Sequence, residues 1–167
     1  MSVEAAVGLG SNEGDRSAHL LAGIALLRQL ARDGSVEVSP FYATAPVDCP
    51  PGSADFLNAV AVFETDLEPD ALLARLLALE AGRGRPARRS RNAPRPLDMD
   101  LLYVGPIRRD GAALTLPHPR LASRRFVLQP LCDLRPDLVL PGQSKTVKEL
   151  LASLPEEGIV RCAQSHG

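Results

Sequence analysis

The chain has 167 residues, a formal net charge of −1, 45% hydrophobic residues and only 4% aromatic residues. This length is typical of one domain that buries about two-thirds of its unfolded surface, so we predict a single domain over residues 1–167. The near-neutral charge argues against a general nucleic-acid binder, because such proteins carry a large positive excess.

Cysteine usage and hydropathy together predict a cytoplasmic protein with no membrane partner. The three cysteines, Cys49, Cys132 and Cys162, lie far apart and form no CxxC pair, which indicates a reducing compartment and no zinc site. The N-terminus has neither the basic region nor the apolar run of a signal peptide, and no segment is long enough to span a bilayer.

Hydrophobic periodicity predicts alternating strands and helices in the first half of the chain. We expect the strand that contains Pro40 to lie at a sheet edge, because proline cannot donate to a β-ladder. The expected elements are a strand over 5–9, a helix from 15 that Gly34 ends, a strand over 36–42, a loop over 45–54, a strand over 56–65 and a helix over 69–82.

The sequence of the second half of the chain predicts shorter elements. The expected elements are a strand over 97–103, a hairpin over 105–116 turning at Arg109-Asp110-Gly111, a brief or broken helix over 126–134, a capped helix over 144–154 and a strand over 158–163. Short connections and half-polar strands favour an α+β sandwich, a mainly antiparallel sheet covered by helices. No glycine-rich strand-to-helix phosphate motif is present, which excludes a P-loop or dinucleotide-binding fold.

An arginine-rich stretch precedes a strand with two acids. The stretch has no acid between Glu80 and Asp98, and its arginines are Arg83, Arg85, Arg88, Arg89, Arg91 and Arg95. Period-2 alternation in the strand puts Leu97, Met99, Leu101 and Tyr103 on one face and the two acids on the other. Asp98 and Asp100 would then lie about 6–7 Å apart along the strand and could hold divalent cations. Arginine offers planar donors to phosphate oxygens, so the two features together indicate a polyphosphate–magnesium site.

Three features allow a simpler interpretation. An arginine run taken alone is more often a solvated face or a nucleic-acid contact, so the alternative is a non-enzymatic RNA-binding module that uses Arg83–Arg95. Asp98 and Asp100 weigh against this alternative, since they would repel an RNA backbone.

Asn58 interrupts an apolar row, and a structural role for it is about as plausible as ligand recognition. His118 lies between two prolines, which favours a positioned hydrogen-bond donor over a purely structural histidine.

The chain resembles the 6-hydroxymethyl-7,8-dihydropterin pyrophosphokinase family of folate biosynthesis. The motifs that carry the resemblance are GLGSNEGDR, FYATAPV, FLNAV, PRPLDMDLL and LPHPRLASRRFVLQPL, which together span most of the chain. The resemblance implies a ferredoxin-like sandwich and a transferase that moves pyrophosphate from ATP to the hydroxymethyl group of the pterin and releases AMP. It also implies two Mg²⁺ ions, and we expect a monomer whose partners are ATP and the pterin, with no nucleic acid.

The resemblance assigns residues to each ligand. It implies Asp98 and Asp100 as metal ligands, which with Arg85 and Arg95 form the catalytic set. The implied ATP contacts are Glu80, Arg85, Arg91, Arg95, His118 and Arg124. The implied pterin contacts are Thr44, Ala45, Pro46, Val47, Phe56, Asn58, Asp98 and Phe126. The chain departs from the family pattern at Ala87, Asn92 and Ala113.

Overall fold

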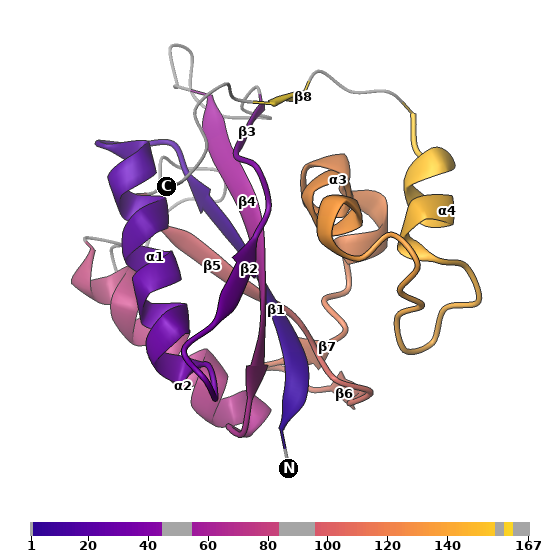
Figure 1. The fold of residues 1–167 in the computed structure, drawn as a ribbon, viewed down its shortest axis with the longest axis horizontal. Helices are drawn as coiled ribbons and strands as arrows, with labels where there is room; N and C mark the ends of the chain where they lie inside the picture. The colour runs from indigo at the N-terminus through magenta and orange to yellow at the C-terminus, as the bar shows by residue number, and fades with distance from the viewer. Residues whose placement is uncertain (1, 45–54, 84–95, 156–158, 162–167) are drawn as a thin grey trace.

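A computed structural model describes residues 2–44, 55–83, 96–155 and 159–161. Within these residues a six-stranded sheet has the order β5-β1-β4-β3-β8, and β2 also pairs with β4. Its pairings are antiparallel. The helices α1 and α2 cover one face of the sheet, and α3 and α4 lie on the other (Figure 1). This arrangement confirms the predicted α+β sandwich.

The elements in chain order are β1 (Val3–Ser11), α1 (Arg16–Leu30), β2 (Val36–Val38), β3 (Tyr42–Thr44), β4 (Phe56–Thr65), α2 (Pro69–Gly82), β5 (Asp98–Val104), β6 (Arg109–Asp110), β7 (Thr115–Leu116), a short 3₁₀ helix η1 (Leu121–Ser123), α3 (Arg125–Leu134), α4 (Val147–Ala152) and β8 (Ile159–Arg161). Strands β6 and β7 form a separate hairpin. The strand predicted over 56–65 and the helix predicted over 69–82 are confirmed, and the strand predicted over 158–163 is confirmed for the described residues 159–161.

The predicted strand over 36–42 is two strands, β2 and β3. Ser39 lies between them, and its hydroxyl accepts a hydrogen bond from the Val60 backbone nitrogen at 3.0 Å. The Ser39 backbone nitrogen still donates to the Val60 oxygen at 2.9 Å, but Pro40 after it has no N–H to give to the ladder, so the regular pairing is interrupted there. Strand β3 pairs with both β4 and β8, so the expectation of an edge strand is wrong for this half.

Two predicted boundaries also differ from the structure, and the alternative left open for the helix over 126–134 is decided. Helix α1 ends at Leu30 rather than at Gly34, which adopts a φ of 75° in the following turn. Arg109 and Asp110 are strand residues, and the hairpin turns after them. Of the brief or broken helix predicted over 126–134, the structure shows the brief one, because α3 is continuous over ten residues although Pro130 lies inside it. Proline removes one hydrogen-bond donor there, and its ring is buried.

Two apolar clusters flank the sheet, and Gly23 brings α1 close to one of them. A Cβ atom at Gly23 would lie 2.5 Å from Leu9 Cδ2 and 3.3 Å from Met99 Cε, so only glycine permits this approach. The alternation predicted for 97–101 is confirmed, since Leu97, Met99 and Leu101 belong to the α1–α2 side.

Tyr103 lies on the opposite face from the one predicted. The register between β1 and β5 shifts from Val7↔Leu101 to Ala6↔Tyr103, which leaves Leu102 as an extra residue. Such a β-bulge inverts the alternation beyond it. Leu102 and Tyr103 therefore both pack beneath α3 and α4, and Val104 returns to the other side.

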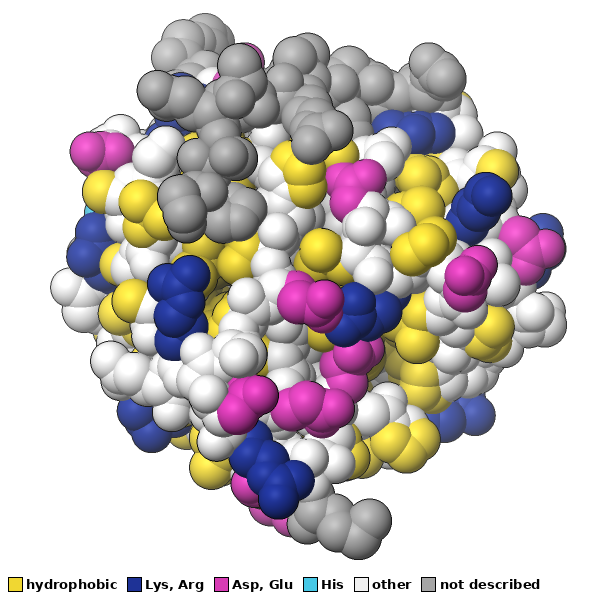
Figure 2. Space-filling view, viewed as in Figure 1, with side chains coloured by type: hydrophobic (Ala, Val, Ile, Leu, Met, Phe, Trp, Pro, Cys, Tyr) yellow, Lys and Arg dark blue, Asp and Glu magenta, His cyan; other side chains and the backbone are white. Residues whose placement is uncertain are grey.

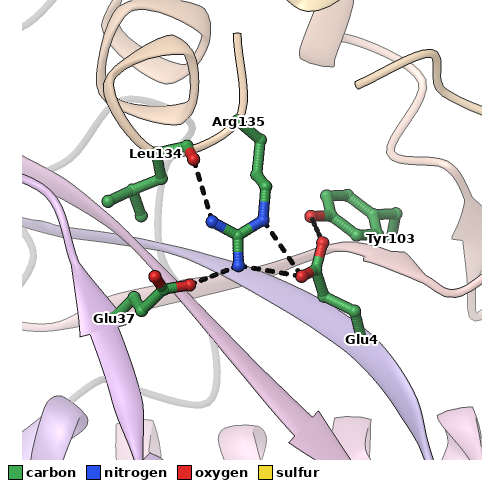
Figure 3. A network of polar contacts seen from close by, with 5 residues as sticks. All are labelled: Glu4, Glu37, Tyr103, Leu134 and Arg135. Atoms are coloured by element: carbon green, nitrogen blue, oxygen red, sulfur yellow. Dashed lines mark hydrogen bonds and ion pairs between the residues drawn. The ribbon is translucent and has the colours of Figure 1, made fainter. Parts of the chain in front are cut away.

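Arg135 fixes the C-terminal end of α3 to the sheet (Figure 3). Its Nε atom donates to Glu4 Oε1 at 3.0 Å, and its Nη2 atom pairs with Glu37. The Tyr103 hydroxyl donates to Glu4 Oε2 at 2.6 Å, and burial together with this bond raises the pKa of Tyr103. Acidic side chains lie beside a basic one near the centre of the face drawn in Figure 2. The network ties α3 to β1, β2 and β5.

Candidate active site

One row of the sheet joins a predicted pterin contact to a predicted metal ligand. Gly10 on β1 lies opposite Asn58 on β4 and opposite Asp98 on β5. Side chains of residues paired in this way project from the same face of the sheet. Asn58 and Asp98 are two strands apart, which is about 10 Å. The face is the one that α3 and α4 cover further along, because Val60 and Leu102 pack beneath those helices.

Gly10 leaves this row without a side chain between the two polar residues. A Cβ atom at Gly10 would lie 3.2 Å from Asn58 Oδ1 and 4.0 Å from Phe56 Cδ1. Phe56 and Asn58 thus border the space above Gly10. The sequence motif GLGSN could have indicated this role, but nothing local to it shows which residues lie across from the glycine.

Asn58 is held by β3. Its Nδ2 atom donates to Thr44 Oγ1 at 2.9 Å, and both side chains are buried. Thr44 ends β3 and lies opposite Phe56. This bond joins Asn58 to β3, and Asn58 Oδ1 lies on the side of Gly10, where a Cβ atom would be 3.2 Å away. Ala45, Pro46 and Val47 follow directly and lie outside the described residues.

Asp98 and Asp100 are partly exposed on the face that carries Asn58, while Met99 between them is buried. Glu80 fixes this segment, since its Oε2 atom accepts a hydrogen bond from the Met99 backbone nitrogen at 2.6 Å. The carboxylate of Glu80 is 2% exposed and comes from α2. Because β5 ends the strand order, its outward N–H can meet a helix side chain instead of another strand.

The backbone of His118 is hydrogen-bonded to the outer edge of β5. Its backbone nitrogen donates to the Leu102 oxygen at 2.8 Å, and its Nδ1 atom accepts from the Arg120 nitrogen at 3.2 Å. Burial lowers the pKa of His118, and the cations Arg124 and Arg120 lower it further, while Asp98 opposes them. The imidazole is therefore neutral near pH 7 and carries its proton on Nε2.

Arg124 and Phe126 form a pair at the beginning of α3. The Arg124 guanidinium carbon lies 5.5 Å from the centroid of the Phe126 ring, within cation–π range. Phe126 is partly buried against the cluster beneath α3. The structure thus brings His118, Arg124 and Phe126 to the same side of the sheet as Asp98 and Asn58.

Most of the arginine-rich stretch lies outside the described residues, including Arg85, Arg91 and Arg95, as do Ala87 and Asn92. Arg83 is described, and its Nε atom donates to His19 Nδ1 at 3.0 Å, a contact that the sequence did not predict. This bond places the beginning of the stretch beside α1. Ala113 is exposed in the β6–β7 turn.

The described part of the chain holds no group of three or more His, Cys, Asp or Glu side chains that could bind a metal ion by themselves. None of its helices is long and apolar enough to cross a membrane.

Comparison with known proteins decides the family. Residues 6–136 match the family described as 7,8-dihydro-6-hydroxymethylpterin-pyrophosphokinase. The chain belongs to this family. A member from Pseudomonas aeruginosa, named 2-amino-4-hydroxy-6-hydroxymethyldihydropteridine pyrophosphokinase, is 41% identical over 155 residues, which are 93% of this chain and 94% of the relative. A relative of the same name from Methylorubrum extorquens is 39% identical over 158 residues, with 93% and 96% covered.

Solved structures of the family support the fold. A crystal structure of Plasmodium falciparum HPPK-DHPS superposes with a TM-score of 0.69 and covers 91% of this chain at 14% identity. The chain spans 45% of that longer protein. At this identity the likeness concerns the fold alone.

Proposed function

We propose that the protein transfers pyrophosphate from ATP to 6-hydroxymethyl-7,8-dihydropterin, forming the pterin diphosphate and AMP in tetrahydrofolate biosynthesis. The observation that carries the proposal is the row Asn58–Gly10–Asp98, which aligns an amide and a carboxylate on one face across a residue without a side chain. A relative that is 41% identical over 93% of this chain bears the name of this enzyme. The alternative of an RNA-binding module has no support among them.

The pterin is assigned to the end of the row near Asn58. The Oδ1 atom of Asn58 offers an acceptor to the amine edge of the pterin, while its Nδ2 atom is engaged by Thr44. Phe56 lies two residues from Asn58 on the same face, and Phe126 projects from α3, so the two rings can contact opposite faces of a flat ligand. Ala45, Pro46 and Val47 complete the proposed pocket.

The metal is assigned to Asp98 and Asp100. Two carboxylates suit Mg²⁺, which commonly binds one or two protein carboxylates and takes its other ligands from phosphates and water. Their partial exposure on the ligand face fits this donor set. We propose two Mg²⁺ ions, which when bound neutralise charge on the phosphate oxygens. Glu80 supports both ligands from behind by holding the Met99 backbone between them.

ATP is assigned to the side of β5 that His118 and Arg124 flank, with Arg85, Arg91 and Arg95 as further proposed contacts. The nucleotide role implied for Glu80 would be indirect, because its buried side chain holds the Met99 backbone. A neutral His118 with Nδ1 already engaged can only donate, through Nε2, which suits a phosphate oxygen. Arg124 adds a permanent cation braced against Phe126.

The reaction forms a bond from the pterin hydroxymethyl oxygen to the β-phosphorus and breaks the bond from that phosphorus to the oxygen that leaves with AMP. The chain contributes mainly by holding the two substrates in line, because positioned reactants can remove about 7–11 kcal/mol of a barrier. The arginines and His118 stabilise charge that develops on the phosphate oxygens. Asp98, which ends the row and is also a proposed pterin contact, lies where the two substrates would meet.

We further propose that residues 1–167 form one catalytic domain that acts as a cytoplasmic monomer on these small molecules, without nucleic acid or membrane.

Asn58→Ala tests the pterin assignment. Removing the amide should weaken pterin binding at least about tenfold and leave ATP affinity unchanged, since a site built to hydrogen-bond a polar edge penalises unpaired groups. Calorimetry with each ligand measures this. Thr65→Val is the matched control, because it removes a buried hydroxyl at the far end of β4. Equal losses for both ligands, or only a lower melting temperature, would contradict the assignment.

A further inference from the structure

Tyr42 forms a bond between the sheet and α3 that the proposed mechanism does not use. The side chain is buried, and its hydroxyl donates to Asp133 Oδ2 on α3. Gln129 on the preceding turn of the helix also donates to Asp133, from Nε2 to Oδ1 at 3.4 Å. Asp133 is thereby oriented by its own helix toward β3.

The bond lies beside the proposed pterin pocket at its sheet end. Tyr42 is opposite Asn58 in the β3–β4 register and two residues before Thr44, which holds the Asn58 amide. Tyr42 thus lies on the strand that positions Asn58. Any shift of β3 relative to α3 moves Thr44 and Asn58 with it.

At its other end the same bond acts on the helix that carries Phe126. Seven residues separate Phe126 from Asp133, which is about two helical turns, so both project from the same side of α3 about 10 Å apart. Arg135 fixes the end of α3 to β1 and β2, but it contacts neither β3 nor β4 through the bonds to Glu4 and Glu37. The bond from Tyr42 to Asp133 adds a polar link between the Phe126 side of α3 and the strand next to Asn58, beside the apolar packing of α3 on Val60 and Val62 of β4.

We propose that Tyr42, through Asp133, is a positioning residue for the pterin: it sets the spacing between Phe126 on α3 and Asn58 on β4, and so the width of the pocket. This inference rests on the proposed function, because it takes the space between those residues as the pterin site. Tyr42 itself need not touch the substrate. A fixed spacing favours a flat ligand whose face contacts the Phe126 ring while its edge meets the Asn58 amide, and loss of the bond removes one of the contacts that hold α3 against β3.

The chain provides a matched comparison, because it has only two tyrosines. Tyr103 is also buried on the face beneath α3 and also donates its hydroxyl to a carboxylate, Glu4. It lies opposite Ala6, four residues along β1 from Gly10, which is about 13 Å from the row of the site. Tyr42→Phe and Tyr103→Phe therefore remove the same group from similar surroundings at different distances from the pocket.

The experiment measures the dissociation constants of the pterin and of a non-hydrolysable ATP analogue, the steady-state constants and the melting temperature for both variants. Tyr42→Phe should raise the pterin dissociation constant and KM about three- to tenfold and change ATP affinity by less than about twofold, in line with the loss of one hydrogen bond. Tyr103→Phe should lower the melting temperature comparably and leave both affinities unchanged.

Asp133 supplies a second test of the same link. Asp133→Asn keeps an acceptor for the hydroxyl and should retain near-normal pterin affinity, whereas Asp133→Leu should reproduce the loss. Combining Asp133→Leu with Tyr42→Phe should add little to either single variant, because both remove one interaction.

The outcomes separate this inference from the function on which it rests. Unchanged pterin affinity in Tyr42→Phe, or an equal loss of affinity in Tyr103→Phe, overturns the positioning role. The proposed function still stands in that case if the wild-type enzyme is active. A wild-type protein that forms no AMP from ATP and the pterin overturns the proposed function, and the inference with it.

Discussion

Gly10→Ala tests whether the row across the sheet is the ligand site. The added methyl group would lie 3.2 Å from Asn58 Oδ1, closer than the ordinary contact range that begins at 3.4 Å. Asn58 would have to move a few tenths of an ångström, and its bond to Thr44 at 2.9 Å resists that movement. Alanine itself suits the backbone, because Gly10 lies in the extended strand β1.

We expect Gly10→Ala to weaken pterin binding. A displaced amide that no longer satisfies the polar edge of a ligand costs about 1–3 kcal/mol, which corresponds to about a 5- to 150-fold weaker affinity. ATP affinity should stay within about twofold, since no proposed ATP contact touches Gly10. Titration calorimetry with the pterin in the presence of a non-hydrolysable ATP analogue measures the first value, and titration with the analogue alone measures the second.

Gly8→Ala is the matched control on the same strand and face. The three atoms nearest to a Cβ atom at Gly8 would all belong to Leu102, the closest at 3.6 Å, which is ordinary contact. Its pterin affinity should remain within about twofold of wild type. The reasoning is refuted if Gly10→Ala folds normally and binds the pterin as wild type does, or if both variants lose affinity alike.

Three further predictions concern the residues around the row. Phe126→Ala should raise the pterin dissociation constant about three- to tenfold, the worth of one aromatic contact; a fall in melting temperature with unchanged affinity would make Phe126 a core residue only. Glu80→Leu should lower the free energy of unfolding by about 1–3 kcal/mol, because the buried Met99 N–H loses its acceptor, whereas Glu80→Gln should retain most stability; equal denaturant midpoints for the two variants would contradict this. The pKa of His118 is lower in the folded protein, so the unfolded chain binds more protons and stability falls as pH drops below about 6.5. His118→Asn should therefore reduce the change in melting temperature between about pH 5 and 7, and an unchanged slope would count against the burial argument.

Elements with a strong local pattern could be predicted from the sequence. The alternation of 56–65 and the proline that begins α2 locate these elements closely. The placement of Asp98 and Asp100 on one face of the strand follows from period-2 alternation over five residues, which is a local property.

Features that depend on distant pairing could not be predicted. Tyr103 changes face because β1 pairs with β5 through a bulge, and the strand over 36–42 is interrupted at Ser39 and Pro40, where Ser39 bonds to Val60 through its side chain as well as its backbone. The proposed role of Gly10 depends on the register between neighbouring strands of the sheet. The proposed role of Tyr42 depends on its hydrogen bond to Asp133, which is 91 residues further along the chain. The pterin contacts were expected only from the family resemblance, since no periodicity indicates what faces Asn58.

The most direct test of the account is AMP formation from ATP by the wild-type chain, Asp98→Asn and Asp100→Asn. Wild type should release AMP in Mg²⁺ only when 6-hydroxymethyl-7,8-dihydropterin is present. Each variant should lose about a thousandfold or more in turnover, because a metal that neutralises the phosphates contributes several kcal/mol. Melting temperatures should change little, since both carboxylates are partly exposed on the ligand face. AMP release without the pterin, or near-normal turnover by either variant, would contradict the account.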